Sequence, residues 1–454
     1  MKMIVTNPKK HSFFKEGKLK RGNVPADHEG FIINVHEDVR YQQILGFGGA
    51  FTESAAYNYA QLSDAQKQEF MEKYFSREKG IGYNFGRLHI NSCDFSLDIY
   101  SYVKDGDLTL ESFDITRERK YLIPFLKDAL RYCDQEIVLF ASPWSPPGYM
   151  KENGNPVGGG VLKEAYKTLW AKYYVKYIQA MAEEGITVSA ISVQNEPKAV
   201  QTWESCTYTP EQERDFIEKH LAPVLDEAGM SHIKIIIWDH NKERVYDRSK
   251  KIFASESVRN RVWAVGHHWY TGDHYEGLRM VHEQFSKVLL STECCCPIDT
   301  PAQTVAERYG TEICNDMNNF TAGFCDWNLM LSEKGGPFHN RSGKTVAVPG
   351  MVFEDKSQGC YAPVLWESEK RKLVFTPTYY YIGHFSKFVQ RGAVRIGTTR
   401  YTADLQVCGF QNPDGTIVLV MLNPTDQDLP AVIRHNDVCT GTELAAHSIM
   451  TVLM

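Results

Sequence analysis

Residues 186–197 read ITVSAISVQNEP, an apolar run rich in β-branched residues that stops at Asn195-Glu196-Pro197. A short run of this kind, bounded by polar and turn-forming residues, predicts a buried β-strand. Amphipathic stretches of helical length lie on both sides of it, at 162–184 and at 210–228, where Pro210 occupies the first turn. A buried strand between two helices is typical of a parallel sheet.

The same alternation continues in both directions from this stretch. Eight strands are predicted, at 44–49, 83–90, 136–142, 186–193, 233–239, 262–269, 287–292 and 322–328. Further helices are predicted at 301–315 and at 63–74, which begins with the capping box Ser63-Asp64-Ala65-Gln66. Eight such repeats over about 290 residues indicate an α/β fold, a (β/α)8 TIM barrel. A doubly wound open sheet is the structural alternative, but the chain lacks a dinucleotide-binding glycine fingerprint.

The pattern changes after residue 385. Strands are predicted at 393–398, 405–411, 416–423, 431–434 and 448–453, separated by turns such as Asn412-Pro413-Asp414-Gly415 and without long helices. Residues 30–39 also alternate in the manner of a strand. We therefore expect a barrel at 43–385 and a small antiparallel β module made of 1–42 and 386–454.

Composition excludes several classes of protein. The 454 residues carry 50 Lys and Arg against 56 Asp and Glu, which argues against nucleic acid as a partner. The Lys-rich segment 9–21 is interpreted as a solvated tail. No apolar run is long enough to span a membrane, and the first residues lack a signal-peptide core, so we expect a cytoplasmic location. The 11 cysteines form no C-x-x-C pair and are expected to be free thiols.

Two glutamates stand where barrel enzymes place their active sites. Glu196 follows the fourth predicted strand and Glu293 follows the seventh, so both lie at the C-terminal mouth. A carboxylate pair there is what glycoside hydrolysis with retention requires, one acting as nucleophile and the other as acid and then base. Taken singly, each could be a solvated surface residue or the start of a helix. Their pairing favours catalysis by Glu196 and Glu293.

Polar and aromatic residues end other strands of the predicted barrel. Arg87, Trp144, His268 and Trp327 are among them, and indole rings with amide and carboxylate groups suit a pyranose pocket. The reaction needs no cofactor. No metal site is expected either, because neighbouring residues on a strand, such as His267 and His268, point to opposite faces.

These motifs together resemble glycoside hydrolase family 30, which contains glucosylceramidases, β-glucosidases, β-xylosidases and β-1,6-glucanases. The resemblance runs nearly end to end and rests on the following segments: Leu45-Gly46-Phe47-Gly48-Gly49-Ala50-Phe51-Thr52, Ser92-Cys93-Asp94-Phe95-Ser96, Ala141-Ser142-Pro143-Trp144, Asn195-Glu196-Pro197, Thr209-Pro210-Glu211 with Arg214-Asp215-Phe216, and Asp326-Trp327-Asn328-Leu329. It implies a TIM barrel with an accessory β-sandwich.

By this resemblance Glu196 is the acid/base and Glu293 the nucleophile. Asn195 would bind the sugar 2-hydroxyl, Arg87 and Tyr270 would hold the nucleophile ionised, and Asp94, Trp144 and Trp327 would line the sugar pocket. The chain departs from the family at Gly335-Gly336-Pro337-Phe338-His339-Asn340 and in the cysteine triplet Cys294-Cys295-Cys296. Both segments are expected to shape the rim of the pocket and therefore the preference for the aglycone.

The sequence thus predicts a retaining β-glycosidase whose partner is a carbohydrate or glycoside substrate. The expected substrates are β-D-glucosides, either glucosylceramide-like lipids or small glycosides. The alternatives are a β-xylosidase or β-fucosidase of the same fold, transglycosylation to an alcohol, or a barrel that binds carbohydrate without catalysis.

Overall fold

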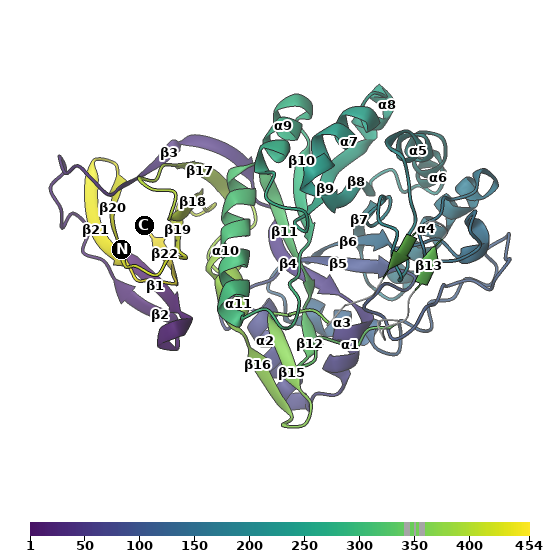
Figure 1. Cartoon of the computed structure of the whole chain (residues 1–454), viewed down its shortest axis with the longest axis horizontal. Coiled ribbons are helices and arrows are strands. Elements are labelled where there is room, and N and C mark those ends of the chain that lie inside the picture. The colour runs from purple at the N-terminus through teal and green to yellow at the C-terminus, as the bar shows by residue number, and fades with distance from the viewer. Residues whose placement is uncertain (340–345, 349–350, 354–358) are drawn as a thin grey trace.

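Eight parallel strands close into a barrel in the computed structural model, which describes residues 1–339, 346–348, 351–353 and 359–454 (Figure 1). They are β4 (Gly46–Phe51), β5 (Phe85–Ile90), β6 (Val138–Pro143), β7 (Val188–Ser192), β8 (Lys234–Asn241), β9 (Val262–His268), β10 (Val288–Glu293) and β11 (Thr321–Asn328). Each overlaps a strand predicted from the sequence. The pairing of β9 with β10 completes the ring, so the TIM barrel is confirmed and the open sheet is wrong.

Helices follow the barrel strands and cover the outside of the barrel. They are α1 (Glu53–Ala60), α2 (Asp64–Phe75), α3 (Leu122–Tyr132), α4 (Lys167–Glu183), α5 (Pro210–Phe216), α6 (Ala222–Glu227), α7 (Val245–Ile252), α8 (Glu256–Arg261), α9 (Tyr275–Phe285), α10 (Ala302–Asn318) and α11 (Pro377–Ser386). Capping boxes start α2 at Ser63 and α5 at Thr209. Each box pairs two backbone N–H groups that a helix start would otherwise leave without partners.

Two predicted helices differ in detail from the observed ones. The helix expected at 162–184 begins only at Lys167, because Leu162 pairs with Lys151 in a β-bridge and a 3-10 turn covers Glu164–Tyr166. The helix expected at 210–228 contains a π-helical turn, Ile217–Leu221, between α5 and α6. Pro223 lies just beyond it and has no N–H for the helical ladder, which accounts for the irregular turn at this point.

An apolar layer fills the middle of the barrel. One side chain from each strand from β5 to β11 contributes to it: Phe85, Phe140, Ala190, Ile236, Ala264, Leu290 and Cys325. Two residues further along, the side chains of the same orientation include Arg87 and Ser142. The interior therefore becomes polar toward the C-terminal ends of the strands, where barrel active sites lie.

The accessory module contains strands from both ends of the described chain. Their hydrogen-bonded order is β2-β1-β22-β19-β18-β17-β3-β20-β21. The strands are β1 (Lys2–Asn7), β2 (Ser12–Lys18), β3 (Ile32–Gln43), β17 (Val394–Thr398), β18 (Gln406–Gln411), β19 (Ile417–Asn423), β20 (Leu429–His435), β21 (Val438–Leu444) and β22 (Ser448–Leu453). Apolar residues of β3 and β20 pack with those of β18, β19 and β22 in one core, so this module is the expected β-sandwich.

The interpretation of residues 9–21 as a solvated tail is wrong. Ser12–Lys18 forms β2, which pairs with β1 in an antiparallel hairpin at the edge of the sheet. An edge strand keeps one side in water, and Lys residues are common there because they oppose pairing with other chains. The charges that suggested a tail belong to this exposed edge.

Smaller sheets lie between the barrel and the sandwich in sequence. β12 (Met330–Ser332), β15 (Val364–Glu367) and β16 (Lys372–Phe375) form one, and β13 (Val346–Val348) pairs with β14 (Met351–Phe353).

Helix α11 joins the barrel to the sandwich. Its buried His384 places Nδ1 2.8 Å from the Thr451 hydroxyl and Nε2 2.9 Å from the Thr6 hydroxyl. Burial lowers the pKa of His384 to about 3, so the imidazole is neutral. A neutral ring with both nitrogens engaged can be buried without an unpaired charge.

Candidate active site

All nine residues predicted to form the site meet at the C-terminal mouth of the barrel. A cavity of about 280 Å³ opens there, lined by Asp94, Trp144, Asn195, Glu196, Gln201, Trp203, His240, Asn241, Tyr270, Glu293, Cys295, Trp327 and Cys360. Arg87 and His268, also predicted, are fully buried and contact the lining residues Glu293 and Glu196. A second, larger cavity lies beside Pro197 and Lys198. Its lining contains a single carboxylate, Asp247, and so lacks the carboxylate pair that glycoside hydrolysis requires.

Glu293 ends β10 and receives two hydrogen bonds. Arg87 Nη1 donates to Oε2 at 2.5 Å, and the Tyr270 hydroxyl donates to Oε1 at 2.9 Å. The first contact is also a buried ion pair, since the Arg87 side chain is wholly inaccessible. The two donors fix the orientation of the carboxylate and balance the negative charge that a nucleophile must carry.

Asp239 links the two halves of the site, a role that was not predicted from the sequence. Its Oδ2 accepts from Arg87 Nη2 and from the Ser142 hydroxyl, both at 2.8 Å, and its Oδ1 lies 3.1 Å from His268 Nε2. Burial acts to raise the pKa of Asp239, but the charge of Arg87 and the hydrogen bond and charge of His268 outweigh it and hold that pKa below its usual range. Asp239 is therefore ionised and orients both neighbours.

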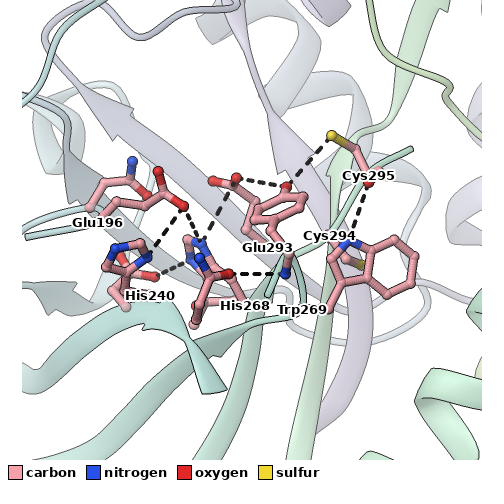
Figure 2. A network of polar contacts seen from close by, with 12 residues as sticks. Glu196, His240, His268, Trp269, Glu293, Cys294 and Cys295 are labelled. Carbon is pink, nitrogen blue, oxygen red and sulfur yellow. Dashed lines mark hydrogen bonds and ion pairs between the residues drawn. The ribbon is translucent and has the colours of Figure 1, made fainter. Parts of the chain in front are cut away.

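Glu196 faces two imidazoles, as Figure 2 shows. Its Oε1 lies 3.2 Å from His268 Nδ1 and 3.4 Å from His240 Nδ1. The same His268 nitrogen is 4.0 Å from Glu293 Oε1. A single atom of His268 is thus within 4.0 Å of both glutamates.

His268 and Glu196 share one proton. Burial acts to lower the pKa of His268, but the charge of Glu293, the hydrogen bonds to Asp239 and Glu196 and the charge of Asp239 raise it to about 9. Burial acts to raise the pKa of Glu196, but hydrogen bonds to His240 and His268 and their charges lower it. In the free protein the shared proton therefore rests on His268 Nδ1, one hydrogen bond away from Glu196.

Aromatic side chains form one wall of the cavity. The rings of Trp144 and Trp327 stack with centroids 5.1 Å apart, and the Arg87 guanidinium lies 4.7 Å from the centre of Trp144. Asn195 Oδ1 accepts from Arg87 Nη2 at 2.8 Å, which fixes the amide at the cavity edge. Flat apolar surface beside oriented polar groups suits a sugar ring.

Sequence reasoning missed several residues of this site. Asp239, His240 and Asn241 end β8, and a polar run at the end of the fifth predicted strand is the signal that could have identified them. Gln201, Trp203 and Cys360 lie on loops and carry no comparable pattern.

The unusual segments have distinct places in the structure. In the cysteine triplet, Cys294 and Cys296 lie in the apolar core, whereas Cys295 lines the cavity. In the loop from Gly335, His339 Nε2 lies 3.0 Å from Glu204 and 2.9 Å from the carbonyl of Cys93. Asn340, the last residue of that motif, lies outside the described residues.

The pair His267 and His268 does point to opposite faces, since His267 Nε2 lies 2.9 Å from the Thr321 hydroxyl and away from the cavity. His268 instead joins His240 and Glu196 in a group whose donor atoms all lie within 4.8 Å of one another. That group is the one arrangement of His, Cys, Asp and Glu among the described residues that has the spacing of a metal site.

Helices of the described residues all fall short of the length and apolar character that crossing a bilayer requires.

Two family models match the chain. The glycosyl hydrolase family 30 TIM-barrel domain matches residues 44–389, and the family 30 β-sandwich domain matches residues 392–452. The lysosomal acid glucosylceramidase of Mus musculus is 30% identical over 445 residues, which is 92% of this chain and 83% of that protein.

Solved structures agree with the family models. SrfJ from Salmonella typhimurium matches with a TM-score of 0.93 and 33% identity, covering 100% of this chain and 99% of that one. The endo-β-1,6-glucanase BT3312 matches with a TM-score of 0.86 and 27% identity, covering 100% and 98%. The chain therefore belongs to glycosyl hydrolase family 30 and is an O-glycoside hydrolase that acts on β linkages.

Proposed function

We propose that this protein is a retaining β-glucosidase in which Glu293 is the nucleophile and Glu196 the acid/base. The observation that carries the proposal is the closeness of both glutamates to His268 Nδ1, at 3.2 Å from Glu196 and 4.0 Å from Glu293. These contacts place both carboxylates at one cavity, as the double displacement of a retaining enzyme requires.

In the first step an oxygen of Glu293 attacks the anomeric carbon of the substrate. The bond from that carbon to the aglycone oxygen breaks as the ester bond to Glu293 forms, and Glu196 gives its proton to the departing oxygen. Arg87 and Tyr270 keep the attacking carboxylate in place through their hydrogen bonds.

The proton for this step comes from His268. While Glu293 is ionised, its charge is the strongest of the influences that raise the pKa of His268. That charge disappears as the ester forms, so the pKa of His268 falls and its Nδ1 proton passes to Glu196 Oε1, 3.2 Å away. Asp239, held on the other ring nitrogen, keeps the imidazole aligned during the transfer.

The second step reverses these proton transfers. Water attacks the anomeric carbon of the ester, Glu196 removes its proton, and the bond to Glu293 breaks to release the sugar with its original anomeric configuration. As the charge on Glu293 returns, the proton moves back to His268 Nδ1.

Two observations support glucosides as the substrates. The relatives carry names that specify glucose compounds, a glucosylceramidase and a β-1,6-glucanase. The cavity of about 280 Å³ is at the lower limit for small-ligand pockets, about 300 Å³, which suits one terminal sugar rather than a polymer. We assign Asp94, Trp144 and Trp327 to the bound sugar and Asn195 to its 2-hydroxyl.

The test is hydrolysis of chromogenic α- and β-linked glucosides, xylosides, fucosides and galactosides by the purified protein. Release from the β-glucoside with the β-anomer appearing first in the proton NMR spectrum supports the proposal. A preference for the β-xyloside or β-fucoside overturns the assigned sugar, and first appearance of the α-anomer overturns the mechanism. Binding of glucosides without turnover by a folded protein overturns both.

A further inference from the structure

His240 lies in an unusual position for a buried histidine. It is 9% exposed, and within the described part of the chain its Nδ1 has one polar contact, with Glu196. That contact joins Nδ1 to Glu196 Oε1 at 3.4 Å, which is longer than an ordinary hydrogen bond. Buried polar atoms in native structures nearly always have well-formed partners, so a nitrogen held at this distance from a carboxylate needs an explanation.

The backbone of β8 places His240 there at some cost. Trp238 and Asp239 have φ angles of 69° and 50°, and the pairing of β8 with β9 shifts between Trp238 and His240. Positive φ in a residue other than glycine is strained and persists where the surrounding structure enforces it, often at functional sites. The bulge brings Asp239 and His240, neighbours in sequence, to the same site.

The donor atoms have the spacing that a small transition-metal ion requires. Zn²⁺ binds histidine nitrogen and carboxylate oxygen at 2.0–2.2 Å in tetrahedral geometry, which separates neighbouring donors by about 3.3 Å. Glu196 Oε1 lies 3.2 Å from His268 Nδ1 and 3.4 Å from His240 Nδ1. The three donor atoms all lie within 4.8 Å of one another, so small rotations of the imidazoles complete the site.

The environment of His268 also suits a metal ligand. Its Nε2 lies 3.1 Å from Asp239 Oδ1, and a carboxylate that accepts the N–H of one ring nitrogen leaves the other free to bind a metal. Asp239 is itself held by Arg87 and Ser142. The outer contacts of a histidine ligand are therefore already in place.

We propose that Glu196, His240 and His268 form a binding site for Zn²⁺ or a similar transition-metal ion, and that the bound ion inhibits the enzyme. The ion occupies the Glu196 oxygen and the His268 nitrogen between which the catalytic proton moves, and it displaces that proton to solvent. The inhibition rests on the proposed role of Glu196, whereas binding of the ion depends on the geometry alone.

The test measures binding and activity separately. Zinc binding to the intact protein is followed by titration calorimetry, and inhibition by hydrolysis of a chromogenic β-glucoside over a range of ZnCl2. The informative variants are His240→Asn, which removes the ligand, and His240→Cys, which replaces it with a thiolate that also binds zinc. His232→Asn is the matched control, because His232 is exposed at the opposite end of β8.

Wild type and His232→Asn are expected to bind one zinc ion at this site and to be inhibited by it. His240→Asn should bind it at least about tenfold more weakly, with the same shift in inhibition, and His240→Cys should recover sensitivity. If His240→Asn binds zinc and is inhibited like wild type, or if the wild type takes up no zinc, the proposal is overturned. Zinc binding that depends on His240 without any β-glucosidase activity would overturn the proposed function and leave the metal site standing.

Discussion

Replacing Asp239 by Asn should disable acid catalysis while leaving the nucleophile in place. The amide has the shape of the carboxylate, and its oxygen can still accept from Arg87 and Ser142. Its NH2 group then faces His268 Nε2, which must become an acceptor, so the only proton of a neutral ring stays on Nδ1. If His268 gave that proton to Glu196, the ring would become an imidazolate anion, which is too unstable to form here. Proton transfer from His268 therefore stops.

The size of the effect follows from what the proton supplies. General acid catalysis contributes about 10²- to 10⁴-fold, which corresponds to about 3–5 kcal/mol of barrier. This loss should appear in kcat/KM for an alkyl β-glucoside, whose leaving oxygen needs the proton. A dinitrophenyl β-glucoside leaves without protonation, so its kcat/KM, which reports the first step, should change little.

A matched variant controls for loss of a buried acid. Asp326 lies near the end of β11, and burial raises its pKa to about 8, so it is neutral at pH 7. Asp326→Asn should keep near wild-type kcat/KM for both substrates. The reasoning is refuted if Asp239→Asn slows the alkyl and dinitrophenyl substrates equally, because Asp239 would then act through Arg87 and the nucleophile. It is also refuted if a folded Asp239→Asn protein, checked by circular dichroism, loses activity on neither substrate.

Further predictions concern the nucleophile, its support and a buried acid. Glu293→Gln should lower kcat by on the order of 10⁶-fold for every β-glucoside, and steady-state assays showing more than a small residual rate would contradict its role. Tyr270→Phe removes a hydrogen bond worth about 1.5–3 kcal/mol to a charged group, so kcat should fall about 10- to 150-fold with KM nearly unchanged; a change confined to KM would argue against it. Between pH 4 and 8 the folded chain keeps a proton on Asp326 that the unfolded chain has released, so the contribution of Asp326 to the free energy of unfolding declines as pH rises through this range. The advantage in melting temperature of Asp326→Asn should therefore grow from pH 4 to pH 8, and an advantage independent of pH would contradict the raised pKa.

The barrel could be predicted because its strands are buried on both faces. Runs such as 186–193 are rich in apolar and β-branched residues, carry no charge and stop at Gln194-Asn195-Glu196, so the strand positions can be recognised in the sequence. The hairpin of β1 and β2 was missed for the opposite reason. Its outer strand has no fully buried residue, and the exposed Lys15, Glu16 and Lys18 give it the composition of a tail until the partner strand is known.

The site could be predicted in part for a related reason. Glu293 ends β10, Glu196 follows β7, and Arg87 lies within β5 with its side chain directed into the barrel, so strand alternation and topology bring the three together. Regular alternation from Ile236, which faces the barrel interior, would direct Trp238 inward and Asp239 outward. The bulge at Trp238 reverses this, and Trp238 packs in the outer core while Asp239 reaches Arg87. The polar run at the end of β8 marks these residues as site candidates, but strand alternation does not predict which of them the bulge turns inward.

The pairing of the sandwich strands delays folding of the sandwich until the end of the chain has been synthesised. Lys2 of β1 lies opposite Leu453 of β22. β3 pairs with β17 and β20, and not with β2 or β4, the strands next to it in the sequence. A ribosome adds about 5–20 residues per second, so β3 waits on the order of 20–70 s for β17 to emerge. Throughout that interval β1 and β3 present unpaired edges while the barrel strands are still being made. A chaperone that shields extended segments on nascent chains would therefore improve the yield of this protein, and a circular permutation that joins the two halves of the sandwich in sequence should lessen its need for one.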